Sequence, residues 1–227
     1  GGLALELAHR ADVEVVGVTL SREQLNAARR RAADAGLSAR VRFELLDWRH
    51  VEGRYDRIVS VGMFEHVGAT HYREFFEHVR DLLAPDGAAL LHSIGRSNGP
   101  GDTNPWMRKY IFPGGYSPAL SEVLSAVEAS GLFATDIEIL RGHYARTIAE
   151  WQRRFQANRG EIAKLYNERF CRMWEFYLTG AEMAFRHQGH MVFQLQLTRD
   201  PEAVPLTRDY MVEAERGMAM EEQRAAE

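Results

Sequence analysis

Three ionisable side chains follow two apolar stretches of the sequence. VSVGMFEHVG, residues 59–68, leaves an apolar run through Glu65 and His66, and LLHSIG, residues 90–95, carries His92. Histidine and glutamate are the side chains that enzymes commonly use to move protons. A lone histidine is more often a packed core residue, but three such groups at neighbouring strand ends are costly to bury without a role. The pattern therefore predicts a site for acid–base chemistry.

These side chains need a sheet that brings the strand ends together. Apolar, alternating segments predict strands at 13–20, 41–45, 55–62 and 88–95, and helical spacing predicts helices at 21–36 and 71–87. Ser21 is a candidate N-cap, with Gln24 three residues further on. This order predicts an α/β fold with a parallel sheet covered by helices. In such a sheet ligands bind outside the carboxyl ends of the strands, so the three side chains should converge there.

The rest of the chain is expected to add a loop, more helices and a last strand. The polar segment 97–105 is read as a lid or binding loop. The expected elements are a helix near 117–130, a strand near 134–140, a helical region over about 146–187 and a strand at 190–197. The charged segment after Pro201 is expected to be a frayed helix or disordered. Gly1-Gly2-Leu3 matches the end of a Gly-rich turn that opens a helix, so the first strand of the sheet is expected to precede Gly1.

Two earlier strand ends carry groups that could hold a nucleoside. Thr19 and Gln24 follow the strand at 13–20 and could bind ribose hydroxyls, with ordinary helix capping as an equal alternative. Asp47 and Trp48 follow the strand at 41–45. An aspartate there could accept a hydrogen bond from an adenine amino group, and a tryptophan could stack on the adenine ring. The alternative is that Trp48 is a core residue and Asp47 belongs to a turn beside it.

Composition excludes several classes of function. The chain has 227 residues and a net charge of −4, which gives no reason to expect nucleic acid as a partner. Cys171 is the only cysteine, so an intramolecular disulfide is excluded and a cysteine-based zinc site is not expected; a reducing cytoplasm fits. We expect Cys171 to be a buried packing residue. No apolar run approaches the roughly 20 residues of a membrane span.

Six segments, taken in order, resemble one known family. They are GVTLS-x-x-Q, DRIVSVGMFEHVG, LLHSIG, NPWMRKYIFPGG, HYARTIAEW and FCRMWEFYLTGAEMAFR. Together they are similar to the cyclopropane-fatty-acyl-phospholipid synthases, which include the mycolic acid cyclopropane synthases. The resemblance implies a Rossmann-like class I S-adenosylmethionine-dependent methyltransferase sheet with helices on both faces. On this reading residues 1–200 form the methyltransferase domain, with a helical insertion at about 146–187, and residues 201–227 form a charged tail.

The resemblance also implies two sets of site residues. The cofactor side would comprise Gly1, Thr19, Gln24, Asp47, Trp48, Val61 and His66. The catalytic side would comprise Glu65, His92, Tyr144 and the backbone of Ile94, which in the family bind a bicarbonate ion. The family's cysteine ligand lies upstream of the segment that this chain matches. No metal is implied.

The implied reaction transfers a methylene group from S-adenosylmethionine to the double bond of an unsaturated phospholipid acyl chain. Methyl transfer to the double bond leaves a carbocation, and bound bicarbonate removes a proton so that a cyclopropane ring closes. Aromatic faces at Tyr110, Phe112 or Tyr177 could stabilise the cation, with core packing as the alternative. The alternatives to a ring as the product are a methyl-branched or a hydroxylated lipid. The alternative functions of the protein are N-methylation of a small molecule and a fragment without activity.

The expected partners follow from that substrate. An acyl chain must leave a bilayer, so we expect a cytoplasmic protein that makes peripheral contact with the inner face of the membrane. A homodimer is also expected. Basic residues of the helical region could meet anionic head groups. They are Arg153, Arg154, Arg159, Lys164, Arg169 and Arg172. The alternative is a set of solvated helix faces on which these residues pair with Glu161 and Glu168.

Overall fold

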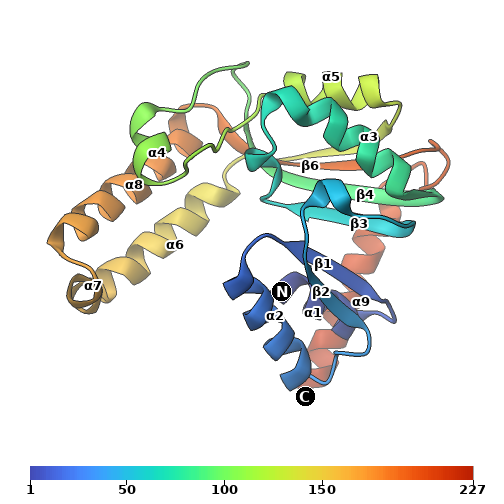
Figure 1. The fold of residues 1–227 in the computed structure, drawn as a ribbon, viewed down its shortest axis with the longest axis horizontal. Helices are drawn as coiled ribbons and strands as arrows, with labels where there is room; N and C mark the ends of the chain where they lie inside the picture. Colours follow the sequence, from blue (N-terminus) through green and yellow to red (C-terminus); the bar gives the residue numbers. More distant parts are fainter. Residues whose placement is uncertain (227) are drawn as a thin grey trace. The chain divides into compact units, whose positions relative to one another are not determined.

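The computed structural model describes residues 1–226, and the chain divides into two compact units. The first unit is Gly1–Gly53, and the second begins at Arg54. Each unit has its own sheet (Figure 1). No helix within residues 1–226 is long and apolar enough to cross a membrane.

The first unit pairs two strands with two helices. It comprises α1 (Gly2–Arg10), β1 (Val15–Thr19), α2 (Arg22–Asp34), β2 (Val41–Leu45) and the 3-10 turn η1 (Trp48–His50). β1 and β2 are parallel, with Val15 opposite Val41. The Ser21 hydroxyl accepts a hydrogen bond from the Gln24 amide at 3.2 Å, which confirms the predicted cap of α2. A small apolar core of this unit consists of Ala8, Leu25, Ala28, Ala32, Val41 and Phe43.

The second unit holds a four-stranded sheet in the order β3-β4-β6-β5. Its strands are β3 (Tyr55–Val61), β4 (Leu83–Arg96), β5 (Phe133–Leu140) and β6 (His190–Thr198). β3 and β4 are parallel, whereas β6 is antiparallel to both β4 and β5. The four strands expected in one parallel sheet thus occur as two parallel pairs in two sheets. Within each pair the parallel direction is as expected, whereas the antiparallel direction of β6 could not be predicted, because an alternating pattern shows which residues share a face and not the direction of the strand.

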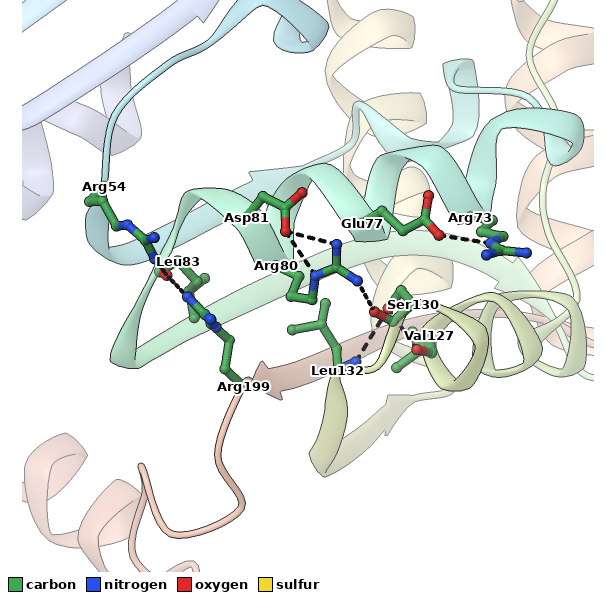
Figure 2. Close-up of polar contacts among 10 residues, drawn as sticks. All are labelled: Arg54, Arg73, Glu77, Arg80, Asp81, Leu83, Val127, Ser130, Leu132 and Arg199. Atoms are coloured by element: carbon green, nitrogen blue, oxygen red, sulfur yellow. Dashed lines mark hydrogen bonds and ion pairs between the residues drawn. The ribbon is translucent and has the colours of Figure 1, made fainter.

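Two helices cover one face of this sheet. α3 (Tyr72–Leu82) and α5 (Leu120–Ser130) pack against each other there (Figure 1). Polar contacts fix their ends (Figure 2). The Arg80 side chain donates to the Ser130 carbonyl at 2.7 Å, and the Leu83 carbonyl at the start of β4 accepts from Arg54 at 3.2 Å and from Arg199 at 3.1 Å. The Leu83 carbonyl therefore joins the start of β4 to the residue before β3 and to the residue after β6.

A helical arm follows β5. The region expected at about 146–187 consists of α6 (His143–Ala157), α7 (Arg159–Leu165) and α8 (Glu168–His187). Its core contains Ile148, Phe155, Leu178 and Cys171, which is fully buried as expected. The sequence reading missed α4 (Pro105–Tyr110), whose start is capped by Asn104 with proline at the first helical position. After Pro201 the chain forms α9 (Asp209–Ala226).

Candidate functional site

Glu65 is held where β4 runs on beyond the end of β3. The last strand pair is Val61 with His92, and the next amide of β4 on that side belongs to Ile94. The chain turns at Gly62 into the 3-10 turn η2 (Phe64–His66), and the fully buried Phe64 ring anchors this turn. Glu65 Oε1 then accepts a hydrogen bond from the Ile94 amide at 2.8 Å. The carboxylate therefore takes the place of the missing strand partner.

A large cavity opens beside this carboxylate. Its volume is about 1690 Å³, and all its lining residues belong to the second unit. Glu65, His66, Ile94 and Tyr144 line it, so three of the four predicted catalytic positions share its wall. The cavity is also lined by aromatic side chains, which are Trp106, Tyr110, Phe112, Tyr116, Trp151, Phe176, Tyr177 and Phe185. The three aromatic residues singled out from the sequence are in this set.

Glu65 and Tyr144 present complementary polar groups to the cavity. Glu65 Oε2 is buried and has no hydrogen-bond partner within residues 1–226. Burial and the nearby Glu65 carboxylate raise the pKa of Tyr144, so the phenol keeps its proton and remains a hydrogen-bond donor. A small anion that carries an acidic hydrogen fits this pair, because the carboxylate accepts a hydrogen bond and the phenol donates one.

His92 is not among the residues that line the cavity in the described part of the chain. It is still paired on both sides, with Val61 on β3 and Gln194 on β6, whereas Ile94 lies beyond the end of β3. The His92 Nδ1 atom lies 3.1 Å from Gln194 Oε1, and Gln194 Nε2 donates to Glu138 Oε2 at 2.7 Å. The structure thus brings Glu65, Ile94 and Tyr144 together and places His92 in a polar row across the sheet. A catalytic role for His92 stays a prediction.

In the first unit, the turn after β1 brings two predicted cofactor residues into contact. The Thr19 hydroxyl lies 3.2 Å from Gln24 Oε1 and also accepts a hydrogen bond from the Ser21 amide at 3.1 Å. Gly1 precedes α1, and a Cβ atom there would come within 2.8 Å of Ala28 and 2.9 Å of Phe43. Glycine at this position therefore allows close packing of the turn, and the cofactor roles of all three residues stay predictions.

Of the remaining predicted cofactor residues, Asp47 and Trp48 belong to a local turn, which is the alternative that the sequence analysis left open, and the cofactor roles of all of them stay predictions. Asp47 caps η1 and binds the Arg49 side chain at 2.7 Å, and these hydrogen bonds from Arg49 lower the pKa of Asp47 to about 2. Trp48 is the first residue of η1 and is half-buried. Val61 is 52% exposed at the end of β3, and His66 is exposed at the cavity wall.

Sequence reasoning missed several polar residues near Glu65. The Tyr116 amide donates to the Glu65 carbonyl at 2.8 Å, and the Tyr116 hydroxyl donates to Glu122 at 2.7 Å. Arg96 and His190 are register partners on β4 and β6 and also line the cavity. Burial, reinforced by Arg96, lowers the pKa of His190. The Gly-Gly turn that precedes Tyr116 was the available signal, while the pairing of β4 with β6 could not be read from spacing.

Comparison with known proteins identifies relatives over nearly the whole chain. The family model described as mycolic acid cyclopropane synthetase matches residues 1–195. The cyclopropane-fatty-acyl-phospholipid synthase of Escherichia coli is 40% identical over 202 residues, which are 89% of this chain and 52% of that protein. The tuberculostearic acid methyltransferase UfaA1 of Mycobacterium tuberculosis is 38% identical over 88% of this chain and 48% of its own length. The chain therefore spans about half the length of these curated relatives.

Solved structures agree with the sequence comparison. The cyclopropane synthase MmaA2 from Mycobacterium tuberculosis has a TM-score of 0.77 and 31% identity, covering 83% of this chain and 71% of that one. Mycolic acid cyclopropane synthase CmaA1, solved with SAH and CTAB, has a TM-score of 0.79 and 32% identity, covering 87% and 74%. The expected class I methyltransferase fold and the family resemblance are both confirmed. The chain belongs to the mycolic acid cyclopropane synthetase family.

Proposed function

We propose that the protein uses S-adenosylmethionine to convert a double bond of an unsaturated phospholipid acyl chain into a cyclopropane ring. The observation that carries this proposal is the aromatic cavity with Glu65 and Tyr144 in its wall, in a chain that belongs to this family. The proposal extends to peripheral contact with the inner face of a membrane, where such a substrate resides.

The size and lining of the cavity support a lipid substrate. Pockets for small molecules usually measure about 300–1,000 Å³, whereas this cavity measures about 1690 Å³. One face of α8 supplies much of the wall, through Met173, Phe176, Tyr177, Ala181 and Phe185. Such a wall suits an acyl chain and keeps water from a reacting carbocation. A soluble amine, the substrate of the N-methylation alternative, would fill only a part of this space.

The aromatic rings also suit the charge that develops in the reaction. A sulfonium cofactor supplies the methyl group, and the attacked double bond becomes a carbocation. Rings that face a cation stabilise it by about 0.5–2 kcal/mol each. Phe112 and Tyr177 lie 5.9 Å apart, centroid to centroid, and Tyr144 and Phe185 lie 5.4 Å apart, and all four rings line the same cavity as Glu65.

Glu65 and Tyr144 are the residues proposed to hold bicarbonate. The buried Glu65 Oε2 would accept the hydrogen bond of the ion's hydroxyl group, and the protonated Tyr144 would donate one to its oxygen. The Ile94 amide orients the carboxylate through Glu65 Oε1. When bound there, bicarbonate would supply a base beside the reacting carbon. His92 is proposed as a further donor.

Replacing Glu65 with Gln tests this assignment. Glutamine keeps the shape and the acceptor for the Ile94 amide, but it removes the negative charge at the second oxygen. We expect turnover on vesicles of unsaturated phospholipid to fall by about 10²–10³-fold, with unchanged affinity for S-adenosylmethionine. Incorporation of a labelled methyl carbon into lipid measures the first quantity, and calorimetry measures the second.

Glu161→Gln on the exposed face of α7 is the matched control, since within the described residues the Glu161 side chain pairs with Lys164 alone, at the surface. Unchanged turnover in Glu65→Gln would remove the proposed role of Glu65. Label found in a water-soluble amine, with none in the lipid fraction of the wild-type reaction, would instead favour the N-methylation alternative.

A further inference from the structure

Six basic side chains of the helical arm were singled out from the sequence, and the structure separates these six into two groups. Four of them are engaged by carboxylates. Arg153 and Arg154 each bind Glu150 at 2.7 Å, Arg159 binds Glu168 and Glu175, and Lys164 binds Glu161 at 2.7 Å. Lys164 pairs with Glu161 and Arg159 with Glu168, as the alternative reading of the sequence expected, whereas Arg153 and Arg154 pair with Glu150 instead.

Arg169 and Arg172 form the second group, which we call the arginine pair. Both line the cavity. Within the described residues Arg169 has no ion pair, and the carboxylate nearest to Arg172 is Glu168 at 3.9 Å, with the Arg172 side chain 65% exposed. The start of α8 therefore contributes to the cavity wall two guanidinium groups whose hydrogen-bonding capacity is largely unused within the described residues.

The arginine pair lies at the opposite end of α8 from the catalytic positions. Arg169 and Arg172 are in the first turns of the helix, while Phe185 in its last turns packs against Tyr144. At 1.5 Å per residue, Arg172 and Phe185 are about 20 Å apart along the axis. The lining between them is apolar and aromatic, through Met173, Phe176 and Tyr177.

This separation matches the dimensions of a phospholipid. One leaflet of a bilayer has a hydrocarbon layer about 15 Å deep beneath a polar layer of roughly 5–8 Å, so a double bond near the middle of a chain lies about 13–15 Å from the phosphate. The long arginine side chains can span the remaining distance. Arg96 also lines the cavity, but it lies two residues beyond Ile94 on β4, about 7 Å away. The Arg96 guanidinium lies over the Tyr116 ring, 5.8 Å from its centroid, and the Tyr116 amide donates to the Glu65 carbonyl, so a phosphate at Arg96 would lie too close to Glu65 for half an acyl chain to fit between them.

We propose that the arginine pair binds the phosphate of the head group of a glycerophospholipid and thereby places the double bond at Glu65 and Tyr144. Guanidinium groups bind phosphate oxygens through paired, charge-assisted hydrogen bonds, which makes arginine suited to this task. The site would select lipids by the distance between phosphate and double bond. This inference rests on the proposed function, since it names the part of the substrate that is held away from the reacting carbon.

The test combines a double variant with a binding measurement that needs no turnover. In Arg169→Gln/Arg172→Gln, two contacts with phosphate are lost, so we expect affinity for phospholipid to fall about tenfold to thirtyfold. Phosphatidylglycerol brominated at the middle of its chains is the probe, because bromine quenches tryptophan fluorescence and Trp106 and Trp151 line the cavity. The KM for unsaturated phosphatidylglycerol should rise by a similar factor, with little change in kcat.

Arg153→Gln/Arg154→Gln is the matched control, because it removes the same charge from the same arm outside the cavity lining. Brominated diacylglycerol, which lacks the phosphate, should bind both double variants and the wild type equally. Equal phospholipid affinity in the wild type and the Arg169/Arg172 variant would overturn the proposal, as would an equal loss in the control variant or with diacylglycerol. Specific quenching without any methyl transfer to lipid by the wild type would leave the phosphate site standing and remove the proposed function.

Discussion

At the scale of single residues, Glu65 has a structural role and is also one of the residues proposed to hold bicarbonate. Its Oε1 atom satisfies the Ile94 amide beyond the end of β3, and its Oε2 atom is buried beside the cavity. A polar residue directly after an apolar strand was a usable signal, so the position of Glu65 could be predicted from the sequence. The partner of His92 could not, because Gln194 lies 102 residues away and meets it only through the pairing of β4 with β6.

The row of His92, Gln194 and Glu138 defines which nitrogen of the histidine carries the proton. A carboxylate accepts hydrogen bonds and cannot donate them, so Glu138 requires the amino end of the Gln194 amide. The carbonyl end of Gln194 must then face His92, and the Nδ1 atom must donate to it. In the neutral ring this leaves the lone pair on Nε2, which can accept a proton. Gln194 and Glu138 are thus positioning residues for His92.

Replacing Glu138 with Gln should release this constraint. A glutamine can donate as well as accept, so the Gln194 amide can turn over and His92 can carry its proton on either nitrogen. We expect nitrogen-15 NMR of labelled histidine to show the Nδ1–H tautomer of His92 in the wild type and a mixture in the variant. Asp136→Asn is the control, since Asp136 is on the same face of β5 and pairs with Arg208. An unchanged tautomer in Glu138→Gln would contradict the proposed order of donors.

At the scale of elements, the end of one helix depends on a single glycine, whereas the helix expected at 71–87 ends at Leu82 because β4 already begins at Leu83. The helix expected near 117–130 ends at Ser130 and is followed by Gly131 with φ +81°, in the left-handed region. The next strand, β5, begins only two residues later, and Arg80 binds the carbonyl of Ser130 at this corner (Figure 2). The turn therefore needs a residue that tolerates positive φ.

Gly131→Ala should destabilise the protein by about 1–2 kcal/mol, because an L-residue at this φ places its Cβ atom too close to the backbone. The midpoint of chemical denaturation measures the loss. Gly160→Ala is the comparison, since Gly160 lies in α7 without a positive φ and a Cβ atom there meets nothing within 4 Å. That variant should be neutral or stabilise the protein by up to about 1 kcal/mol. Equal midpoints for the two variants would show that the backbone of Gly131 is not constrained.

Most elements of the second unit could be predicted, and the exceptions have physical causes. β3 and β5 lie within a residue of the expected ranges, because turn residues bound their apolar segments. α4 is too short to show helical periodicity, although Asn104-Pro105 is a recognisable start. The antiparallel direction of β6 depends on long-range pairing with β4, which no local pattern contains.

At the scale of the whole molecule, the two units differ in the means by which they are stabilised. The first unit has two strands in its sheet, and three of its six core residues are alanines, which bury little surface. The second unit has four paired strands with fully buried Phe193, Leu195 and Val192 on β6. A two-stranded sheet with a small core is marginally stable, whereas a wider sheet between packed layers is the more protected type of structure.

This difference predicts unequal opening of the two units in the native state. Amide hydrogens of β1 and β2 should exchange at least about tenfold faster than those of β4 and β6, because the smaller unit can open without the larger sheet. Leu25→Ala removes apolar contacts from the first core and should speed exchange in β1 and β2 further while leaving β4 and β6 unchanged. Hydrogen exchange read by mass spectrometry resolves these segments. If Leu25→Ala raised the exchange rate equally in β2 and β6, the two units would open as one cooperative structure, and their separate cores would not correspond to separate units of stability.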